Sequence, residues 1–403
     1  MILLKNIKQL LTLDAAHSKD GRKLTKDDLS LLENISLIHD NDKILWIGND
    51  VPKDKFSIQK EVECSKFVIT PEIVDSHTHL VFGGDRSFEY SLRLNGGDYT
   101  DIANAGGGIL NTMRATNQAD NEELFESACE RIERLHSYGV GTIEIKSGYG
   151  LNYDKEYELS HIIDRLKKKY APNIQIINTF MAAHAIPKNF SSGKDYLEKV
   201  VFPLMDGLAK EKIIDIVDIF HEEGYFSYED TELFFNKAKS LKLPVKSHAD
   251  EFKDNKGAVL ASKYEALSCD HLLCTTEDGI TSLAKSKTVA SLLPGTGFFL
   301  GKPQANAKAF LEAGAKVAIG SDYNPGSCHW DNVLMIASIA APNYGMNMSQ
   351  LWSSITLNAA HSLGLYNQGA IKIGLSARFS VFNCPSLDHI TYNWGRNFST
   401  KLN

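Results

Sequence analysis

Several features that would assign this chain to a familiar class are missing from its 403 residues. No uninterrupted apolar stretch reaches the roughly 18 residues that a membrane-spanning helix needs. Lys5 and Lys8 interrupt the apolar N-terminal run and no small-residue cleavage site follows it, so we expect no signal peptide. The six cysteines include no CxxC pair. They are therefore interpreted as free thiols in a reducing cytoplasm.

An excess of positive charge is also missing, since the formal net charge is −7. This value argues against a nucleic-acid surface and is compatible with an enzyme that acts on a small molecule. A GxGxxG turn, which is typical of an open dinucleotide-binding sheet, does not occur after the first expected strand of the central region. The triple glycine 106–108 is not followed by Lys-Ser or Lys-Thr. We interpret it as a mobile loop or a close backbone approach rather than a phosphate-binding loop.

The central part of the chain alternates strand-like and helix-like segments. Amphipathic helical patterns, such as those over 121–139 and 154–170, lie between most of the strands. Eight such units over about 300 residues predict a closed (β/α)8 TIM-like barrel of the α/β class, with an open doubly wound sheet as the alternative. The expected strands cover 67–77, 139–147, 174–184, 216–224, 243–251, 265–272, 288–295 and 315–322.

The two ends of the chain differ from the centre because they contain short apolar runs separated by polar turns. Asn41 and Asp42 lie between two of these runs, which indicates a hairpin. Chain termini often meet in space, so we expect both ends to form one small β-sandwich. The predicted division is 1–65 plus 373–403 for the sandwich and 66–372 for the barrel.

Most of the expected strands end in polar side chains that a buried strand would otherwise avoid. A random scatter of 13 histidines would not favour strand ends. The carboxyl ends of barrel strands converge on one face, where barrel enzymes carry their chemistry. This distribution therefore predicts an active site on that face. The strand-end residues are His77 and His79, Lys146 and Tyr149, His184, His221 and Glu222, His248 and Glu251, Asp270 and His271, and Asp322 with Asn324.

The stretch HTH places His77 and His79 on one side of a strand, because alternate side chains point the same way. Two imidazoles about 6–7 Å apart along a strand can bind one metal ion, although two histidines on an exposed edge strand are the alternative. His248 could supply a third nitrogen and Asp322 an oxygen, a set that suits one Zn²⁺ or Fe²⁺ ion and leaves a position for water. The alternatives are a hydrogen-bonded core histidine and the N-cap of a helix.

A bound metal ion lowers the pKa of water from about 15.7 towards 7. Attack on a carbonyl then needs a proton acceptor and a group that polarises the carbonyl oxygen. Asp322 could take the proton, and Glu251 could hydrogen-bond the water or a substrate N–H. His271 could polarise the carbonyl or orient Asp322, or it could simply pair with Asp270. The candidate catalytic residues are Glu251, His271 and Asp322.

The loop after the first expected strand contains Arg86, whose planar guanidinium could bind a substrate carboxylate through two parallel hydrogen bonds. The alternative is a surface ion pair with Asp85 or Glu89. Tyr99 could equally be an exposed loop tyrosine. The side chains that could hydrogen-bond a polar ring are Tyr99, Tyr149 and His184.

Seven motifs, taken in order, resemble the signature set of the imidazolonepropionase family, the hydrolases of histidine degradation within the amidohydrolase superfamily. The match runs from about residue 66 to 330 and more loosely to both ends. KSGYGL and DYNPGS are specific to this family, whereas HxH and GSD occur in many relatives. The motifs are DSHTHLVFGGDR, AGGGI, KSGYGL, AAHAIP, SHADEF, DHL and GSDYNPGS.

The resemblance implies a cytosolic, dimeric enzyme with zinc or iron. Its barrel would open the ring of 4-imidazolone-5-propanoate with water to give N-formimino-L-glutamate. By the same resemblance, Glu251 and His271 lie close to the chemistry. Arg378 stands where relatives usually have an acidic residue, in the sandwich and away from the site. The resemblance assigns His77, His79, His248 and Asp322 as metal ligands, Arg86, Tyr149 and His184 as substrate ligands, and Asn324, Gly326 and Ser327 as the residues that hold the amino-acid end of the product.

Two other functions stay open at this point. A different amidohydrolase, for example a deaminase acting on a cyclic amidine, would not need Arg86 to meet a carboxylate. A catalytically inactive barrel that serves as a scaffold would typically lose metal ligands, and all four are present here. We expect a small-molecule substrate, and neither a nucleic acid nor a membrane as a partner.

Overall fold

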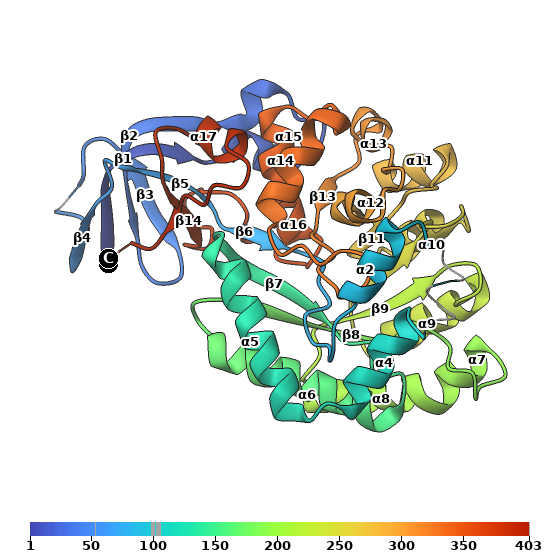
Figure 1. Ribbon diagram of the computed structural model, residues 1–403. Helices are drawn as coiled ribbons and strands as arrows, with labels where there is room; N and C mark the ends of the chain where they lie inside the picture. The colour runs from blue at the N-terminus through green and yellow to red at the C-terminus, as the bar shows by residue number, and fades with distance from the viewer. Residues whose placement is uncertain (53, 98–100, 102–105, 403) are drawn as a thin grey trace.

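The computed structural model contains two sheets, a barrel in the centre of the chain and a second sheet made from both termini (Figure 1). It describes every residue except 53, 98–100, 102–105 and 403. The eight barrel strands are parallel and follow one another in chain order. They are β6 (Ile73–Asp75), β7 (Val140–Lys146), β8 (Gln175–Ala183), β9 (Ile216–His221), β10 (Val245–Ala249), β11 (Ser268–His271), β12 (Val289–Leu292) and β13 (Val317–Ile319).

The barrel closes just beyond the carboxyl ends of its first and last strands. There Thr78 and Tyr323 form a parallel bridge. Asp322 N donates to His77 O at 3.0 Å, and His79 N donates to Tyr323 O at 2.9 Å. The predicted barrel is therefore confirmed as a nearly closed one, and its closure brings the HTH stretch next to Asp322.

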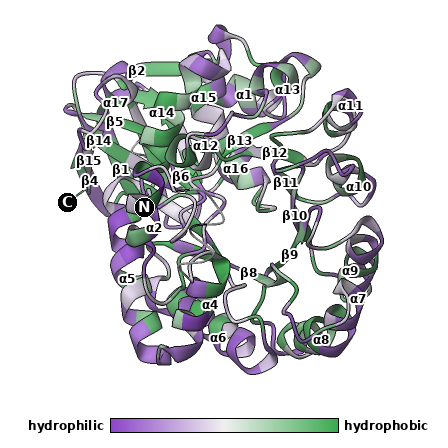
Figure 2. Ribbon diagram, turned by 45° about the vertical axis from the view of Figure 1, so that its right-hand side comes forward, coloured by the Kyte–Doolittle hydropathy of each residue, from purple (hydrophilic) through white to green (hydrophobic). Residues whose placement is uncertain are grey.

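Helices lie outside the strands, as Figure 2 shows for α6, α8, α9, α10 and α11. In α5, buried Leu124, Ala128, Ile132 and Leu135 recur every three or four residues, so one face packs on the barrel. None of the helices in the described ranges combines the length and hydropathy that a bilayer crossing requires. The helices that follow barrel strands are α5 (Asn121–Ser137), α6 (Tyr153–Tyr170), α8 (Phe202–Glu211), α9 (Tyr228–Ser240), α10 (Gly257–Lys263), α11 (Glu277–Lys285), α13 (Ala307–Ala313) and α14 (Val333–Tyr344).

The remaining helical segments connect or cover these elements. Three of them follow α14 or lie near the C-terminus, and the others lie in the connections between strands. They are α1 (Asp14–Ser18), η1 (Lys26–Leu29), α2 (Ser87–Leu94), α4 (Ile109–Gln118), α7 (Gly193–Tyr196), η2 (Leu197–Val201), α12 (Pro294–Leu300), α15 (Met348–Ser354), α16 (Leu357–His361) and α17 (Leu387–Tyr392).

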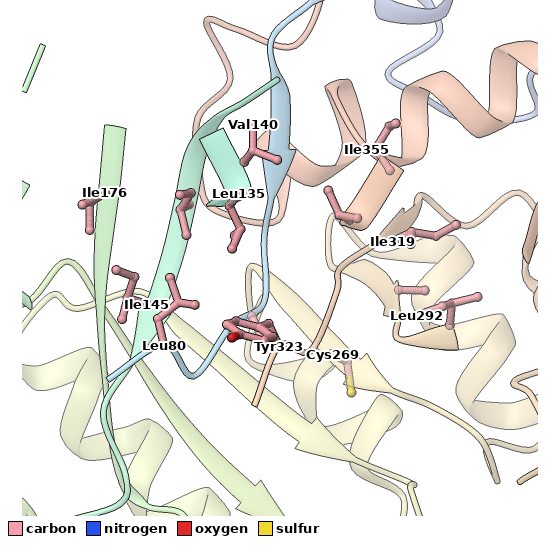
Figure 3. Packing of buried hydrophobic residues seen from close by; sticks show 14 of the residues in the cluster. Leu80, Leu135, Val140, Ile145, Ile176, Cys269, Leu292, Ile319, Tyr323 and Ile355 are labelled. Carbon is pink, nitrogen blue, oxygen red and sulfur yellow. The ribbon is translucent and has the colours of Figure 1, made fainter. Parts of the chain in front are cut away.

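In β7, apolar and charged side chains alternate. Ile143 and Ile145 belong to the main hydrophobic core, part of which Figure 3 shows around Leu135 and Ile145. Glu144 and Lys146, which alternate with them, are fully buried. Barrel interiors are usually filled with branched apolar residues. A charged interior here indicates a specialised role for the residues beneath the catalytic face.

The second sheet has seven strands in the order β15-β14-β5-β1-β2-β3, with β4 also paired to β1. Its central strand β1 shifts register around Asn6, which has φ 56°, so β4 and β5 pair with different halves of it. Strands β2 and β3 form the hairpin expected at Asn41 and Asp42. The strands are β1 (Ile2–Leu11), β2 (Leu31–His39), β3 (Ile44–Gly48), β4 (Lys60–Glu63), β5 (Phe67–Pro71), β14 (Phe379–Asn383) and β15 (Ser399–Thr400).

The strand expected over 67–77 is two strands that belong to different sheets. Strand β5 pairs with β1 and β14 in the terminal sheet, whereas β6 pairs with β7 in the barrel. The chain changes sheet at Glu72, whose N–H donates to Arg378 O at 3.2 Å. The predicted domain boundaries at 65/66 and 372/373 stay predictions. Strand β5 begins after the boundary at 65/66, yet it belongs to the terminal sheet.

Candidate metal and substrate site

Four predicted ligands come together at the carboxyl end of the barrel. His79 Nε2 lies 3.4 Å from His248 Nε2. Asp322 Oδ1 lies 3.6 Å from His77 Nε2 and 3.7 Å from His79 Nε2. One nitrogen from each of the three histidines fits within a span of 4.8 Å, and all three residues are buried. Donors at this spacing could hold a metal ion.

Two buried carboxylates orient two of these imidazoles from below. His77 Nδ1 lies 2.6 Å from Asp270 Oδ2, and His248 Nδ1 lies 3.2 Å from Asp218 Oδ2. A carboxylate that accepts the Nδ1–H leaves Nε2 as the coordinating atom, which is the usual arrangement of histidine ligands. His77 and His79 are buried, so the alternative of an exposed edge-strand pair does not apply to them.

The carboxylates belong to a network of five fully buried charges inside the barrel. Lys146 Nζ lies 2.6 Å from Asp218 Oδ2 and 2.9 Å from Glu144 Oε2. Lys246 Nζ lies 2.8 Å from Glu144 Oε2 and 3.3 Å from Asp270 Oδ2. Burial alone would lower the pKa of Lys146, but the charges of Asp218, Glu144 and Asp270 raise it above its ordinary value. The lysine therefore stays charged and balances the carboxylates that hold the histidines.

Three imidazoles of the site, those of His77, His79 and His271, have lowered pKa values, which favours the neutral form that a metal ligand needs. Burial lowers the pKa of His77 well below its ordinary value, and the charge of Lys146 acts in the same direction. Burial and the neighbouring His184 do the same for the pKa of His79. The pKa of His271 is also lowered well below its ordinary value by burial and by His248.

Asp322 stands in the left-handed region of backbone conformation, with φ 53°. Such conformations in residues with a side chain are strained and concentrate at functional sites. Its second oxygen, Oδ2, accepts a hydrogen bond from Thr296 Oγ1. Burial raises the pKa of Asp322 to about 6. A cation beside the carboxylate would favour the ionised form.

Glu251 and His271 lie beside the ligands. Glu251 Oε2 is 3.7 Å from His271 Nδ1, and the His271 ring centroid is 5.1 Å from that of His248. Burial, followed by the like charges of Asp322 and Glu222, raises the pKa of Glu251 to about 8. A carboxyl group of this kind can both hold and release a proton near neutral pH. The alternative pairing of His271 with Asp270 is not what the structure shows, because Asp270 pairs with His77.

Arg86 makes the ion pair with Glu89 that was considered as the alternative to substrate binding. Its Nε and Nη2 donate to the two Glu89 oxygens at 2.9 and 2.8 Å. The remaining nitrogen, Nη1, lies over Gly326, where an added Cβ would come within 1.8 Å of it. Glu89 Oε1 also accepts from Gly108 N at 2.9 Å, and Gly108 has φ 83°. The structure thus brings Arg86, the triple glycine and the Asn324 loop together.

The aromatic candidates Tyr149 and His184 lie next to His79. The rings of His79 and His184 are stacked at 5.2 Å, and Tyr149 lies 5.4 Å from His184. Burial lowers the pKa of His184 to about 3, so it is neutral and can accept or donate a hydrogen bond. Tyr99 lies outside the described residues.

The Asn324 loop is held largely by its own hydrogen bonds. Asn324 Oδ1 accepts from Gly326 N and from Ser327 N, both at 2.8 Å. Asn324 Nδ2 donates to Asp322 O at 2.7 Å. In this structure the polar groups of the three residues shape the loop against Arg86. Their predicted contact with substrate or product stays a prediction.

Reasoning from the sequence missed the residues beneath and beside the ligands. Asp218, Glu144 and Thr296 were not predicted to have a role, Lys246 was not among the predicted site residues, and Asp270 was noted only at a strand end and as a partner of His271. A signal was present, because charged residues alternate with apolar ones in EIK, VDI and VKSH within otherwise buried strands. Period-two alternation in a strand that is covered on its outer face predicts charged groups inside the barrel.

Known proteins resemble this chain along most of its length. The model of the Amidohydrolase family matches residues 68–400. A curated imidazolonepropionase from Clostridium tetani is 37% identical over 401 residues, which cover 98% of this chain and 95% of the relative. The imidazolonepropionase from Bacillus cereus strain G9842 is 37% identical over 398 residues, which cover 98% of this chain and 93% of the relative.

Solved structures of more distant proteins share the fold. The zinc complex of atrazine chlorohydrolase from Arthrobacter aurescens aligns with a TM-score of 0.74 at 13% identity, covering 99% of this chain and 93% of that one. An adenosine deaminase from Xanthomonas campestris with bound zinc aligns with a TM-score of 0.70 at 16% identity, covering 100% of this chain and 91% of that one. Because the family model and the curated relatives both extend along most of its length, the chain belongs to the imidazolonepropionase family of the amidohydrolases.

Proposed function

We propose that this protein hydrolyses 4-imidazolone-5-propanoate to N-formimino-L-glutamate in histidine degradation. The observation that carries the proposal is the convergence of three imidazoles and Asp322 at one end of the barrel, in a chain that is 37% identical to a curated imidazolonepropionase. The reaction adds water to the ring carbonyl at C4 and breaks the bond from C4 to the ring nitrogen. The leaving nitrogen takes a proton, and C4 becomes a carboxylate.

The donors fit one divalent ion of zinc or iron. His77 Nε2 is buried and has no hydrogen-bond partner among the described residues. The Nε2 atoms of His79 and His248 face each other, and a carboxylate oxygen of Asp322 completes a set of three nitrogens and one oxygen. When bound there, such an ion would lower the pKa of a coordinated water molecule towards about 7.

The residues of this chain would supply the proton transfers. Asp322 Oδ1 lies among the ligand nitrogens, where it can accept a proton from the attacking water. Glu251 is close enough to His271 to share a hydrogen-bonded path with the substrate, and its raised pKa suits it to protonate the leaving nitrogen. His271, which is neutral, can donate a hydrogen bond to the carbonyl oxygen as negative charge develops on it.

Arg86 would bind the propanoate group. Glu89 holds its guanidinium in place through two hydrogen bonds, and Nη1 faces the Asn324 loop. Tyr149 and His184 lie beside His79 and can hydrogen-bond the polar ring. A ring bound there would have its carbonyl near the metal ligands and its propanoate group directed to Arg86.

The direct test measures turnover and metal content together. Protein loaded with Zn²⁺ or Fe²⁺ is expected to consume imidazolonepropanoate, and a chelator is expected to stop the reaction until the metal ion is restored. Elemental analysis of the isolated protein should give about one ion per chain. Protein that holds one ion per chain and does not turn over this substrate would contradict the proposal.

The second candidate is another amidohydrolase reaction, such as deamination of a cyclic amidine, and the adenosine deaminase fold relative is the observation that favours it. Arg86→Ala separates the two. Loss of a charge-assisted hydrogen-bonded pair with a carboxylate is worth about 1.5–3 kcal/mol, or roughly 10- to 150-fold in kcat/KM. Such a loss on a substrate with a propanoate group, without a loss on one that lacks it, supports the first reaction.

We also propose a cytoplasmic homodimer, as the family resemblance implies. Sedimentation equilibrium of the purified protein would measure the mass of the assembly. A single species with the mass of one chain at micromolar concentration would exclude the dimer.

A further inference from the structure

The loop after β10, residues 250–257, carries Glu251 into the site and is held by a carboxylate from the neighbouring strand. Glu222 follows the last residue of β9. Its Oε2 accepts from the backbone N–H of Glu251 at 2.8 Å and from that of Phe252 at 2.9 Å. A single buried oxygen therefore binds the main chain on both sides of the Glu251 Cα.

The other Glu222 oxygen is also fully used. Oε1 accepts from Glu223 N at 3.0 Å and from Asn255 Nδ2, which belongs to the same loop. The Glu222 residue is only 2% exposed. In the parts of the chain that the structure describes, Glu222 forms no ion pair with a lysine or an arginine. Four N–H donors thus stabilise its charge, and three of them come from residues of the loop.

The rest of the loop is similarly constrained. Asp250 has φ 53°, and its Oδ1 accepts from Asn255 N at 3.2 Å and from Gly257 N at 3.1 Å. His221 Nε2, at the end of β9, lies 3.0 Å from Asn255 O. These contacts fold the loop back on itself, but among the described residues only Glu222 contacts the backbone N–H of Glu251.

We propose that Glu222 is a positioning residue that holds Glu251 in its reactive place beside His271 and Asp322. The inference rests on the role of Glu251 in the proposed function. With its backbone held at two successive N–H groups, the Glu251 carboxylate stays 3.7 Å from His271. Displacement of a reacting group by about 1 Å can lower a rate by roughly 100-fold.

The test compares kcat and KM of metal-loaded variants. Glu222→Ala and Glu222→Asp are expected to lower kcat by about 10- to 100-fold with little change in KM. Alanine removes the carboxylate, and aspartate withdraws it by about one C–C bond, about 1.5 Å. Glu222→Gln is expected to stay within about threefold of the wild-type kcat. Its amide oxygen can still accept the N–H groups of Glu251 and Phe252, and the Asn255 amide can turn to match the new NH₂, although the N–H of Glu223 loses its acceptor.

Glu223→Ala is the matched control. Glu223 is the adjacent residue and reaches the same loop through Lys253, but this ion pair is exposed. Its loss is expected to leave kcat unchanged. Metal content and the melting temperature of each variant separate a displaced loop from a damaged fold. Should the alanine variant fail to fold, the aspartate and glutamine variants give the same comparison.

A double-mutant cycle with Glu251→Gln decides whether Glu222 acts through Glu251. In the Glu251→Gln background, Glu222→Ala is expected to lower kcat by less than about threefold, because the positioned group is already gone. If the fold-loss in kcat of the double variant equals the product of the fold-losses of the two single variants, the inference is overturned. Wild-type kcat in Glu222→Asp would overturn it as well. Wild-type kcat in Glu251→Gln alone would instead remove the proposed role of Glu251, and the inference with it.

Discussion

The contact between His77 and Asp270 makes a quantitative prediction about metal affinity. Asp270 Oδ2 lies 2.6 Å from His77 Nδ1, and both side chains are completely buried. In Asp270→Asn an amide oxygen can still accept the Nδ1–H, so the ring keeps its orientation while the negative charge is lost. The variant thus isolates the electrostatic part of the contribution of Asp270.

The expected loss follows from the surroundings of the carboxylate. Partners of this kind typically contribute 10- to 100-fold to metal affinity, or about 1.4–2.8 kcal/mol. Lys246 loses one of its two acidic neighbours but keeps Glu144 at 2.8 Å, so the network does not leave a lysine without a carboxylate. We therefore expect the Zn²⁺ dissociation constant of Asp270→Asn to rise by about 10- to 100-fold.

The assay is competition for Zn²⁺ against a chromophoric chelator, with the metal-free protein checked by its melting temperature. Asp215→Asn is the control, because Asp215 also pairs with a lysine, Lys167 at 2.7 Å, but immediately precedes β9 at the opposite end of the barrel. It should bind Zn²⁺ like the wild type. An unchanged dissociation constant in a folded Asp270→Asn protein would refute the reasoning.

Three further predictions concern the joint between the sheets, the N-terminal segment and the substrate side of the site. Arg378→Ala leaves the buried Glu72 carboxylate without the guanidinium 2.8 Å away; chemical denaturation should show a loss of about 3 kcal/mol, and adding Glu72→Gln should restore part of it. Burial alone would raise the pKa of Asp28, but its hydrogen bonds lower it below 3.8. The contribution of Asp28 to the free energy of unfolding is thus complete above about pH 3.8 and is lost as the pH falls below it. The free energies of unfolding of Asp28→Asn and the wild type should therefore converge in acid. Gly326→Ala would place a Cβ 1.8 Å from Arg86 Nη1; we expect KM for imidazolonepropanoate to rise at least about tenfold, and an unchanged KM would contradict the placement of Arg86.

Much of the barrel could be predicted from local sequence patterns. Strands such as β7 and β9 combine a buried apolar face with turn signals on both sides, and the helical repeats of α5 and α6 have the period of one apolar face. The split between β5 and β6 could not be predicted in this way. One of the two strands that pair with β5 comes from residues 379–383, about 300 positions later.

The candidate metal ligands could be identified because barrel topology by itself brings strand ends together. The sequence left two alternatives open for Arg86, and the structure shows both an ion pair with Glu89 and a close approach to Gly326. The role of Glu222 could not be inferred from the sequence, because its carboxylate oxygen Oε2 accepts from backbone N–H groups of the loop that follows the next strand, β10.

The order of strands and helices, the residues at the strand ends and the alternation of charge inside buried strands were determined by the sequence alone, because each depends on spacing within one segment. Only the tertiary structure decided which carboxylate faces which imidazole or lysine. His77 meets Asp270 across 193 residues of chain, and Lys246 meets Glu144 across 102. Such pairs form because the curvature and closure of the barrel bring separate strands together, and no local pattern encodes that geometry.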